Sequence, residues 1–423
     1  SALYNNTTAS NNTAVGTSAL VTNTTGAYNT AVGNNALYAN TTSASNTAVG
    51  YAAMQSNTTG TGNTAAGAVA GDALTVGSWN TAIGHTALGA DTQGSHSVAL
   101  GYGALTSQNF TSATNSYNTA LGNNSLYANT TGASNTAVGY AAMQSNTTGA
   151  ENTVIGANAL DANTTGSANV AVGQGCLDTN TTGLQNTAVG HDSMKSNTTG
   201  QENVAIGKAA LNANTTANDN TAVGRSALSL NTTGASNTAV GRYALKANTT
   251  GYKNVALGLN ASGSVNTGYE NTSIGTDAGN GTTTGLRNVF LGAKAGTYLV
   301  ATTTGDKNVI LGSYSHANDA TASQVSALGY ALSADAGYTT LGYSSNDIRA
   351  AHGVASWATV SDERYKKDIT SSTAGLAFVN DLTPRTWNYK TLGELPETFN
   401  AYKAGSTEVF KNTQTNHGFI AQE

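Results

Sequence analysis

The sequence contains very little proline, charge or cysteine. Its 423 residues include two prolines and one cysteine, and 9% of them are charged. The scarcity of proline leaves the backbone free to form long hydrogen-bonded ladders, and a single cysteine excludes a disulfide within one chain. A formal net charge of −5 argues against a nucleic-acid partner. No apolar run reaches 18 residues, so we expect no membrane insertion.

The sequence also lacks the usual signatures of cofactor and metal sites. It has no phosphate-binding GxxxxGK[ST] loop and no calcium-binding GGxGxD repeat. Five of the six histidines lie at unrelated places with no metal-ligand spacing: His85, His96, His191, His316 and His352. We therefore predict no cofactor and no metal. The lone Cys176 stands where the repeat usually has Ala, which predicts a small core residue rather than a nucleophile.

The dominant feature of the sequence is a repeat of 17 residues. One unit reads N-T-A-V-G-x-x-A-L-x-x-N-T-T-G-x-x, and it recurs from Asn12 to Asn288 with small variations. Gly, Asn and Thr are poor helix residues, and no apolar side chains recur at helical spacing. Each unit instead offers two short strand-like segments separated by Gly- and Asn-rich turns. The repeat predicts an all-β fold, a β-solenoid or β-roll with one coil per unit.

Stacked coils place equal positions of the unit above one another, about 4.8 Å apart. Position 4 then forms an apolar column of Val, Ile and Leu, position 9 a column of Leu and Met, and position 1 an Asn ladder. We predict that position 4 packs inside the coil and that position 9 packs against the same column of sister chains. This arrangement gives a homotrimer around a shared axis. The alternative is a wide single-chain solenoid with both columns inside.

Irregularities in the repeat predict the domain organisation. We expect the repeat shaft over residues 1–312, an irregular β transition region over 313–360, and a separate domain over 361–423. Two units are lengthened. One gains four residues, so that Gln108 to Tyr117 form a longer loop that contains Phe110, and the other gains three and carries Tyr298. Insertions in solenoids form loops on one face and often bind a ligand, although a simple slip in repeat length explains them equally well.

The last segment differs in composition from the shaft. Both prolines, Pro384 and Pro396, and many of the charged residues fall in 361–423. Ser361 can cap a helix, with acidic residues following it in the first turn, and 376–382 has apolar spacing that suits a second helix. The stretch Thr386–Tyr389 has strand character. We expect a small α+β domain here.

Two blocks of this segment carry a family resemblance. The run SDERYKKDI from Ser361 to Ile369 and the run HGFIAQE from His417 to Glu423 resemble the intramolecular chaperone of endosialidase and phage tail spikes, the S74 peptidase type. The resemblance implies a domain, here partial, that trimerises a β-rich fibre and in many members then cuts itself off. The repeats are similar to those of fibre proteins that carry this domain and to the head rolls of trimeric autotransporter adhesins.

The resemblance also implies candidate catalytic residues. Ser361 would be the nucleophile, Lys366 its general base, and Val360–Ser361 the bond that is cut. His417 would polarise or orient the site. Burial of Lys366 at a trimer interface would lower the pKa of its amine, so cleavage would follow assembly. The alternative interpretation makes Ser361 a helix cap and Lys366 a solvated lysine.

Three hypotheses of function follow. The first is a rigid extracellular fibre segment, of a phage tail fibre or a bacterial surface fibre, that supports adhesion to a glycan or receptor. The second is a precursor whose only reaction is a single self-cleavage before Ser361, rather than an enzyme that turns over. The third is an ice-binding solenoid that uses stacked Thr columns such as that of Thr13.

Overall fold

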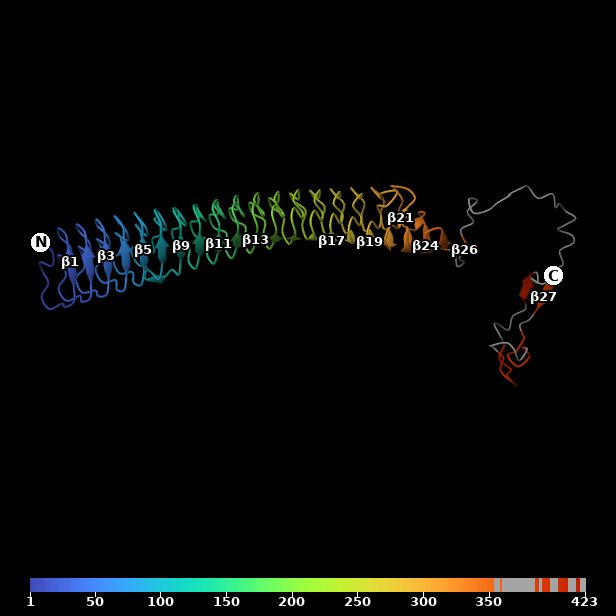
Figure 1. The fold of residues 1–423 in the computed structure, drawn as a ribbon, viewed down its shortest axis with the longest axis horizontal. Helices are drawn as coiled ribbons and strands as arrows, with labels where there is room; N and C mark the ends of the chain where they lie inside the picture. Colours follow the sequence, from blue (N-terminus) through green and yellow to red (C-terminus); the bar gives the residue numbers. More distant parts are fainter. Residues whose placement is uncertain (354–357, 360–384, 388–389, 396–401, 410–415, 419–423) are drawn as a thin grey trace. The chain divides into compact units, whose positions relative to one another are not determined.

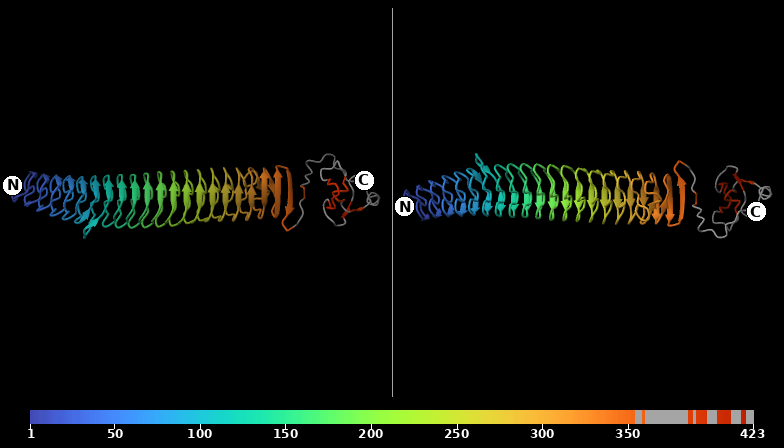
Figure 2. Two further views of the ribbon diagram at one scale, coloured as in Figure 1. Left: turned by 90° about the horizontal axis from the view of Figure 1, so that it is seen from below. Right: turned by 90° about the horizontal axis from the view of Figure 1, so that it is seen from above.

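The structure is a computed structural model that describes residues 1–353, 358–359, 385–387, 390–395, 402–409 and 416–418. The chain divides into two compact units, residues 1–360 and residues 361–423. The first is a shaft of stacked coils (Figures 1 and 2). In the second, β27 (Arg385–Trp387) pairs antiparallel with β28 (Asn416–Gly418), which confirms strand structure near Thr386. The helices expected after Ser361 and over 376–382 lie outside the described residues.

The shaft is a β-solenoid, as the repeat predicts, and the described residues contain no helix. Positions 2 to 4 of each coil form a short strand that pairs in parallel with the same positions of the next coil. Thr221 pairs with Thr238, for example, and Val223 with Val240. The strands run side by side along the gently curved shaft (Figures 1 and 2). The ladder strands of the regular coils are β1 (Thr13–Val15), β2 (Thr30–Val32), β3 (Thr47–Val49), β4 (Thr64–Ala66), β5 (Thr81–Ile83), β7 (Val98–Leu100), β9 (Thr119–Leu121), β10 (Thr136–Val138), β11 (Thr153–Ile155), β12 (Val170–Val172), β13 (Thr187–Val189), β14 (Val204–Ile206), β15 (Thr221–Val223), β16 (Thr238–Val240), β17 (Val255–Leu257), β18 (Thr272–Ile274), β19 (Val289–Leu291) and β20 (Val309–Leu311).

The shaft changes at its C-terminal end. The spacing between ladder strands shortens to 13 residues between β22 (Ser326–Tyr330) and β24 (Tyr338–Tyr343), which still pair in parallel. The chain then reverses, because β25 (Asn346–Ala351) pairs antiparallel with β24. The remaining strands are short: β6 (Gly94–Ser95), β8 (Thr114–Asn115), β21 (His316–Ala317), β23 (Ser333–Ala334) and β26 (Ala358–Thr359). The strands β6 and β8 pair in parallel and join the first lengthened coil to the coil before it.

The apolar core lies inside each single chain, at positions 3, 8 and 9 of the coil. In the coil that begins at Asn203, Ala205, Ala210 and Leu211 have no exposed surface. The Leu and Met column of position 9 therefore fills the interior of its own chain, and the prediction that it needs a sister chain is wrong. Cys176 is fully buried at position 8, as predicted for a core residue.

The position-4 column points out of the coil, so the prediction that it packs inside is wrong. Ile206 is 40% exposed, whereas its neighbour Ala205 is fully buried. The reason is the strand period of two: once the position-1 Asn and the position-3 Ala point inward, positions 2 and 4 must point outward. The alternative of a single-chain solenoid with the position-4 and position-9 columns both inside is wrong as well, because position 4 is exposed. In-register stacking of the column is confirmed.

Asparagine ladders form the polar part of the core, as expected for position 1. Asn186 Oδ1 accepts from the backbone N–H of Asn203 at 3.1 Å, and Asn203 Nδ2 donates to the carbonyl of Ala217 at 2.9 Å. A second ladder occupies position 12, where Asn197 Nδ2 donates to Asn180 Oδ1 at 2.8 Å. These amides satisfy backbone groups at the turns, which a buried coil edge would otherwise leave unpaired.

Candidate functional site

The outward positions 2 and 4 of all coils together form a flat surface, which we call the strand face. Position 2 carries Thr or Val and position 4 carries Val, Ile, Leu or Ala. Three residues per strand make this face about 10 Å wide, and roughly nineteen coils make it on the order of 90 Å long. Large apolar side chains are exposed along its whole length: Val15, Val49, Ile83, Val98, Leu100, Leu121, Ile155, Ile206, Val255, Leu257, Leu291, Val309 and Leu328.

Aromatic side chains border the strand face on both edges. The leading flank is the residue before each position-1 residue, and it carries exposed Tyr28, Trp79 and Tyr117. The trailing flank is position 6, and it carries exposed Tyr51, Tyr102 and Tyr140. Trp79 is 60% exposed, and the rings of His85 and Tyr102 stack at 5.6 Å along the trailing flank.

The area of the strand face is on the order of 900 Å², more than the roughly 300–600 Å² of the largest apolar patch on an ordinary monomer. Its chemistry is that of a protein interface, with β-branched and aromatic side chains and almost no charge. The sequence pattern contained this face, because the alternation Asn-Thr-Ala-Val assigns Thr and Val to one side. The small size of Ala suits a narrow interior, but Ala and Val are both apolar, so the sequence alone did not settle which side faces inward.

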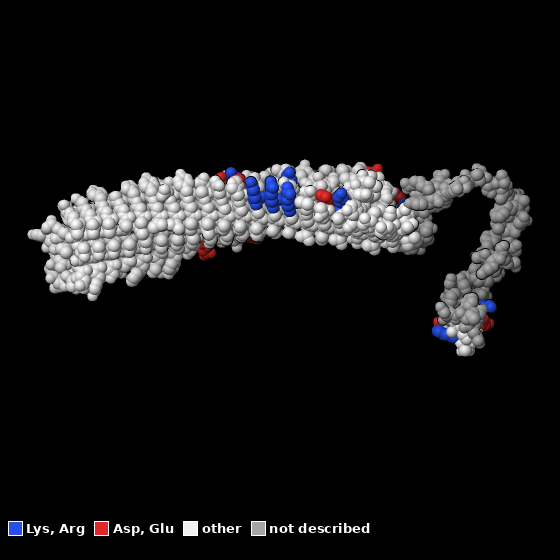
Figure 3. Space-filling view, in the orientation of Figure 1, with Lys and Arg blue, Asp and Glu red and all other residues white. Residues whose placement is uncertain are grey.

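The basic residues of the shaft all lie in its second half. The first 194 residues contain no Lys or Arg. Lys208, Arg225 and Arg242 occupy the trailing flank of three successive coils, and all three are exposed. Figure 3 shows a group of Lys and Arg side chains on the surface of the shaft. Glu202 and Asp219 occupy the leading flank of two of the same coils and are exposed as well. The Arg242 guanidinium lies 4.6 Å from the ring centre of Tyr243.

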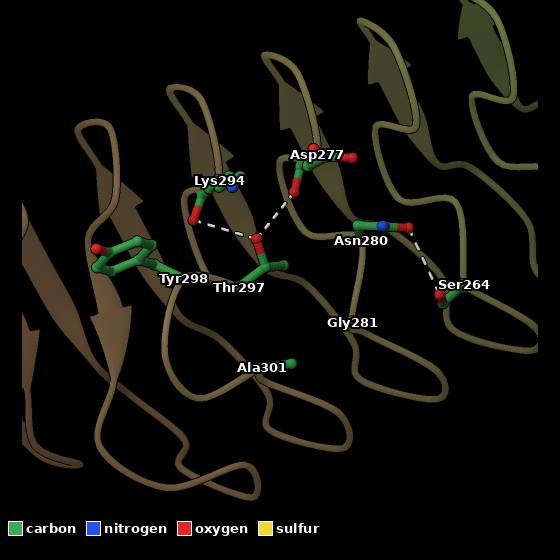
Figure 4. A pocket seen from close by; sticks show the side chains of 8 residues that line it. All are labelled: Ser264, Asp277, Asn280, Gly281, Lys294, Thr297, Tyr298 and Ala301. Atoms are coloured by element: carbon green, nitrogen blue, oxygen red, sulfur yellow. Dashed lines mark hydrogen bonds between the residues drawn. The ribbon is translucent and has the colours of Figure 1, made fainter.

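A hollow of about 370 Å³ lies beside the second lengthened coil (Figure 4). Thr297 anchors the extra loop, because its Oγ1 donates to the carbonyls of Asp277 at 3.0 Å and Lys294 at 3.2 Å. Tyr298, Lys294 and Asp277 supply an aromatic ring, a cation and a carboxylate to the rim. The Tyr298 ring also meets that of Tyr314 edge-on at 4.9 Å. The expectation of a loop at this insertion is confirmed. That the loop binds a ligand stays a prediction.

The first lengthened coil holds a buried polar network instead of a hollow. Asp91 takes the place of the position-12 Asn and is fully buried. Its carboxylate accepts from Gln108 Nε2 at 2.7 Å and from the backbone N–H groups of Gly94 at 3.0 Å and Phe110 at 3.2 Å. Burial raises the pKa of Asp91, and these hydrogen bonds offset part of that rise.

The residues predicted for self-cleavage are only partly covered by the structure. Ser361 and Lys366 lie outside the described residues. His417 lies on β28, opposite Thr386 of β27. The proposed roles of the three residues therefore stay predictions.

The comparisons with known proteins identify the C-terminal segment. Residues 361–423 match the family described as the chaperone of endosialidase, of the S74 peptidase type. Comparison with curated proteins gives no match. The chain thus combines a β-solenoid shaft with a segment, residues 361–423, that is similar to the chaperone of endosialidase.

Within the described part of the chain, no helix has the length and apolarity needed to cross a membrane. No group of three or more His, Cys, Asp or Glu side chains that could hold a metal ion occurs among the same residues.

Proposed function

We propose that this protein is a segment of an extracellular fibre, a phage tail fibre or a bacterial surface fibre, in which three parallel chains pack through their strand faces. The observation that carries the proposal is the continuous apolar strand face with its aromatic borders. The chaperone match at 361–423 supports the number three, since the resemblance implies trimerisation of β-rich fibres.

The dimensions of the strand face suit a stable interface. A stable protein interface buries about 800 Å² on each partner, and the strand face offers on the order of 900 Å² before its aromatic borders are counted. The chain closes its own core at positions 3, 8 and 9, so each shaft folds as a unit and then associates. The apolar contact between chains is therefore made by the Val, Ile and Leu column of position 4. It replaces the position-9 column predicted from the sequence.

Light scattering on a matched pair of variants tests the interface. Ile206→Asp puts a charge in the centre of the strand face, and we expect it to convert the trimer into monomer, because a carboxylate buried between apolar columns has no partner. Leu230→Asp is the control, since Leu230 is 50% exposed at position 11, away from the strand face. A wild-type mass of one chain, or equal behaviour of the two variants, would contradict the proposal.

The fibre would hold a recognition element at a distance and make adhesive contacts of its own. A shaft of roughly nineteen coils spans on the order of 90 Å. The hollow beside Tyr298 combines an aromatic ring with polar groups, which suits a sugar of a surface glycan. Glycan-array binding that is lost in Tyr298→Ala, with the oligomer intact, would support this role.

Self-cleavage before Ser361 is a second candidate, favoured by the family match. Ser361 Oγ would attack the carbonyl carbon of Val360, so that an ester forms as the amide bond to the Ser361 nitrogen breaks and that nitrogen takes up a proton. Water would then hydrolyse the ester and release the fragment that begins at Ser361, with Lys366 as general base and His417 as the orienting group. Purified full-length precursor should release a fragment beginning at Ser361, and Ser361→Ala should prevent it. A stable wild-type chain would leave only the chaperone role.

Ice binding gains one supporting observation, because the Thr13-type column lies on the flat strand face. The column is interrupted by Val at several coils, and association of chains would cover it. Thermal hysteresis measured on wild-type protein and on the Ile206→Asp variant decides the matter. Ice binding requires activity in at least one of the two.

A further inference from the structure

We propose that Glu202 and Asp219 of one chain form ion pairs with Lys208 and Arg225 of the neighbouring chain, and that these pairs set the parallel orientation of the chains. The inference rests on the proposed function, since it needs shafts that pack through their strand faces. It adds which residues meet across the border of that contact and why the chains point the same way.

The first observation is the placement of charge on the two flanks. In the coil of Asn203, the leading flank is Glu202 and the trailing flank is Lys208. In the next coil the flanks are Asp219 and Arg225. Among the regular coils from Asn12 to Asn308, only these two have a charge on both flanks, and in both the leading flank is acidic and the trailing flank basic.

The second observation is that these charges find no ion-pair partner within the described shaft. Five residues of mostly extended backbone lie between Glu202 and Lys208, so the two are up to about 20 Å apart along the strand direction. No ion pair joins any of the four to another residue of the described shaft, although the chain does pair charges elsewhere. Arg287 Nε, for example, lies 2.8 Å from Glu270 Oε2 on the leading flank.

The third observation is that each flank stacks like charges on successive coils. Lys208, Arg225 and Arg242 repeat at about the 4.8 Å spacing of the coils, and Glu202 and Asp219 do the same on the other flank. At this distance like charges repel each other, more strongly where water is partly excluded. The same field lowers the pKa of Tyr243, first through a hydrogen bond from Arg242 and then through the charge of Arg225. A single chain leaves this repulsion uncompensated.

Rotational symmetry brings the two flanks together. When parallel chains are related by rotation about an axis along the shaft, the leading flank of one chain lies beside the trailing flank of the next. A closed ring also puts equal coils at the same height. Glu202 of one chain then lies at the same level along the axis as Lys208 of its neighbour. In the same way, Asp219 lies at the level of the neighbour's Arg225. Antiparallel packing of two strand faces would instead set leading flank against leading flank and remove the complementarity.

Charge reversal on the full-length chain tests the inference. Glu202→Lys with Asp219→Lys makes both flanks basic, and Lys208→Glu with Arg225→Glu makes both acidic. Because the two pairs recur at each of three borders, we expect each double variant to assemble about tenfold more weakly at low salt. Added NaCl should reduce the defect by screening. The quadruple variant, which exchanges the two signs, should assemble as wild type does.

The control is Glu151→Lys, because Glu151 is on a leading flank whose coil has Ala157 on the trailing flank. It should assemble normally. The measurement is the mass by light scattering over a concentration series, with the melting temperature as a check on folding. Assembly of the double variants equal to wild type, or a quadruple variant that is not restored, overturns the inference.

The test separates this inference from the proposed function. A monomeric wild-type chain refutes the trimeric fibre itself. A wild-type trimer that is indifferent to the reversals refutes only the ion pairs. Heparin binding gives a further outcome. If the wild-type protein is retained on heparin, and the variant Lys208→Glu with Arg225→Glu stays trimeric but is not retained, then the cation column faces solvent and binds a polyanion. That result also overturns the inference.

Discussion

At the scale of the residue, asparagine and alanine set the shape of the coil. The position-1 Asn uses both atoms of its side-chain amide to bind backbone groups. Asn186 Oδ1 accepts from the N–H of Asn203, and Asn186 Nδ2 donates to the carbonyl of Gly200 at 2.8 Å. The position-3 Ala is the inward side chain of the strand and is fully buried in coil after coil. Small apolar groups and amides together fill a core too narrow for a conventional hydrophobic interior.

Asp91 gives a prediction about pH. Burial raises the pKa of Asp91 in the folded protein, so the folded state holds this proton at pH values where the unfolded chain has released it. Stability should therefore fall as pH rises from the ordinary carboxyl range through the raised pKa. Urea unfolding over this range should show the fall in wild type and a flatter profile in Asp91→Asn. A wild-type profile that rises through the window would contradict the assignment.

At the scale of the element, the coil depends on glycine at position 5. Gly207 has φ +132°, and a Cβ built there would lie 2.7 Å from the carbonyl carbon of Gly224 in the next coil. The residue thus combines a left-handed backbone with direct contact between coils. The same arrangement recurs along the ladder, so the spacing of the coils is set by glycine backbones in contact.

The variant Gly207→Ala should destabilise the shaft by roughly 2–4 kcal/mol, because the methyl group forces two coils apart and the φ is strained. Gly337→Ala is the control, since Gly337 has φ +76° and no atom within 4 Å of its added Cβ. It should cost only about 1 kcal/mol, from backbone strain alone. Unfolding midpoints in urea compare the two, and equal losses would show that the close approach is unimportant.

At the scale of the whole molecule, the closed core has a consequence for the monomer. Positions 3, 8 and 9 are buried without a second chain, so a shaft kept from associating should still fold. Electron micrographs of the Ile206→Asp variant should show rods of about 90 Å, the same length as wild type but thinner. Shorter or collapsed particles would mean that the shaft needs its partners in order to fold.

The sequence by itself determined the repeat, the β-solenoid and the in-register columns, because a 17-residue period with Gly and Asn turns admits few other structures. It also located the lengthened coils and the family segment after residue 360. It did not decide which columns face inward. Val15 and Leu20 are both apolar, and the pattern alone does not distinguish a core residue from an interface residue.

Only the tertiary structure decided that question. The position-1 Asn must point inward to satisfy the backbone at the turns, as Asn29 does by donating through Nδ2 to the carbonyl of Ser43 at 2.8 Å. Strand alternation then turns Ala inward and Val outward, while the sharp turn after Gly folds the position-9 Leu back inside. The direction of a side chain depends on where the backbone finds its hydrogen-bond partners, and these lie 14 or 17 residues away in the sequence.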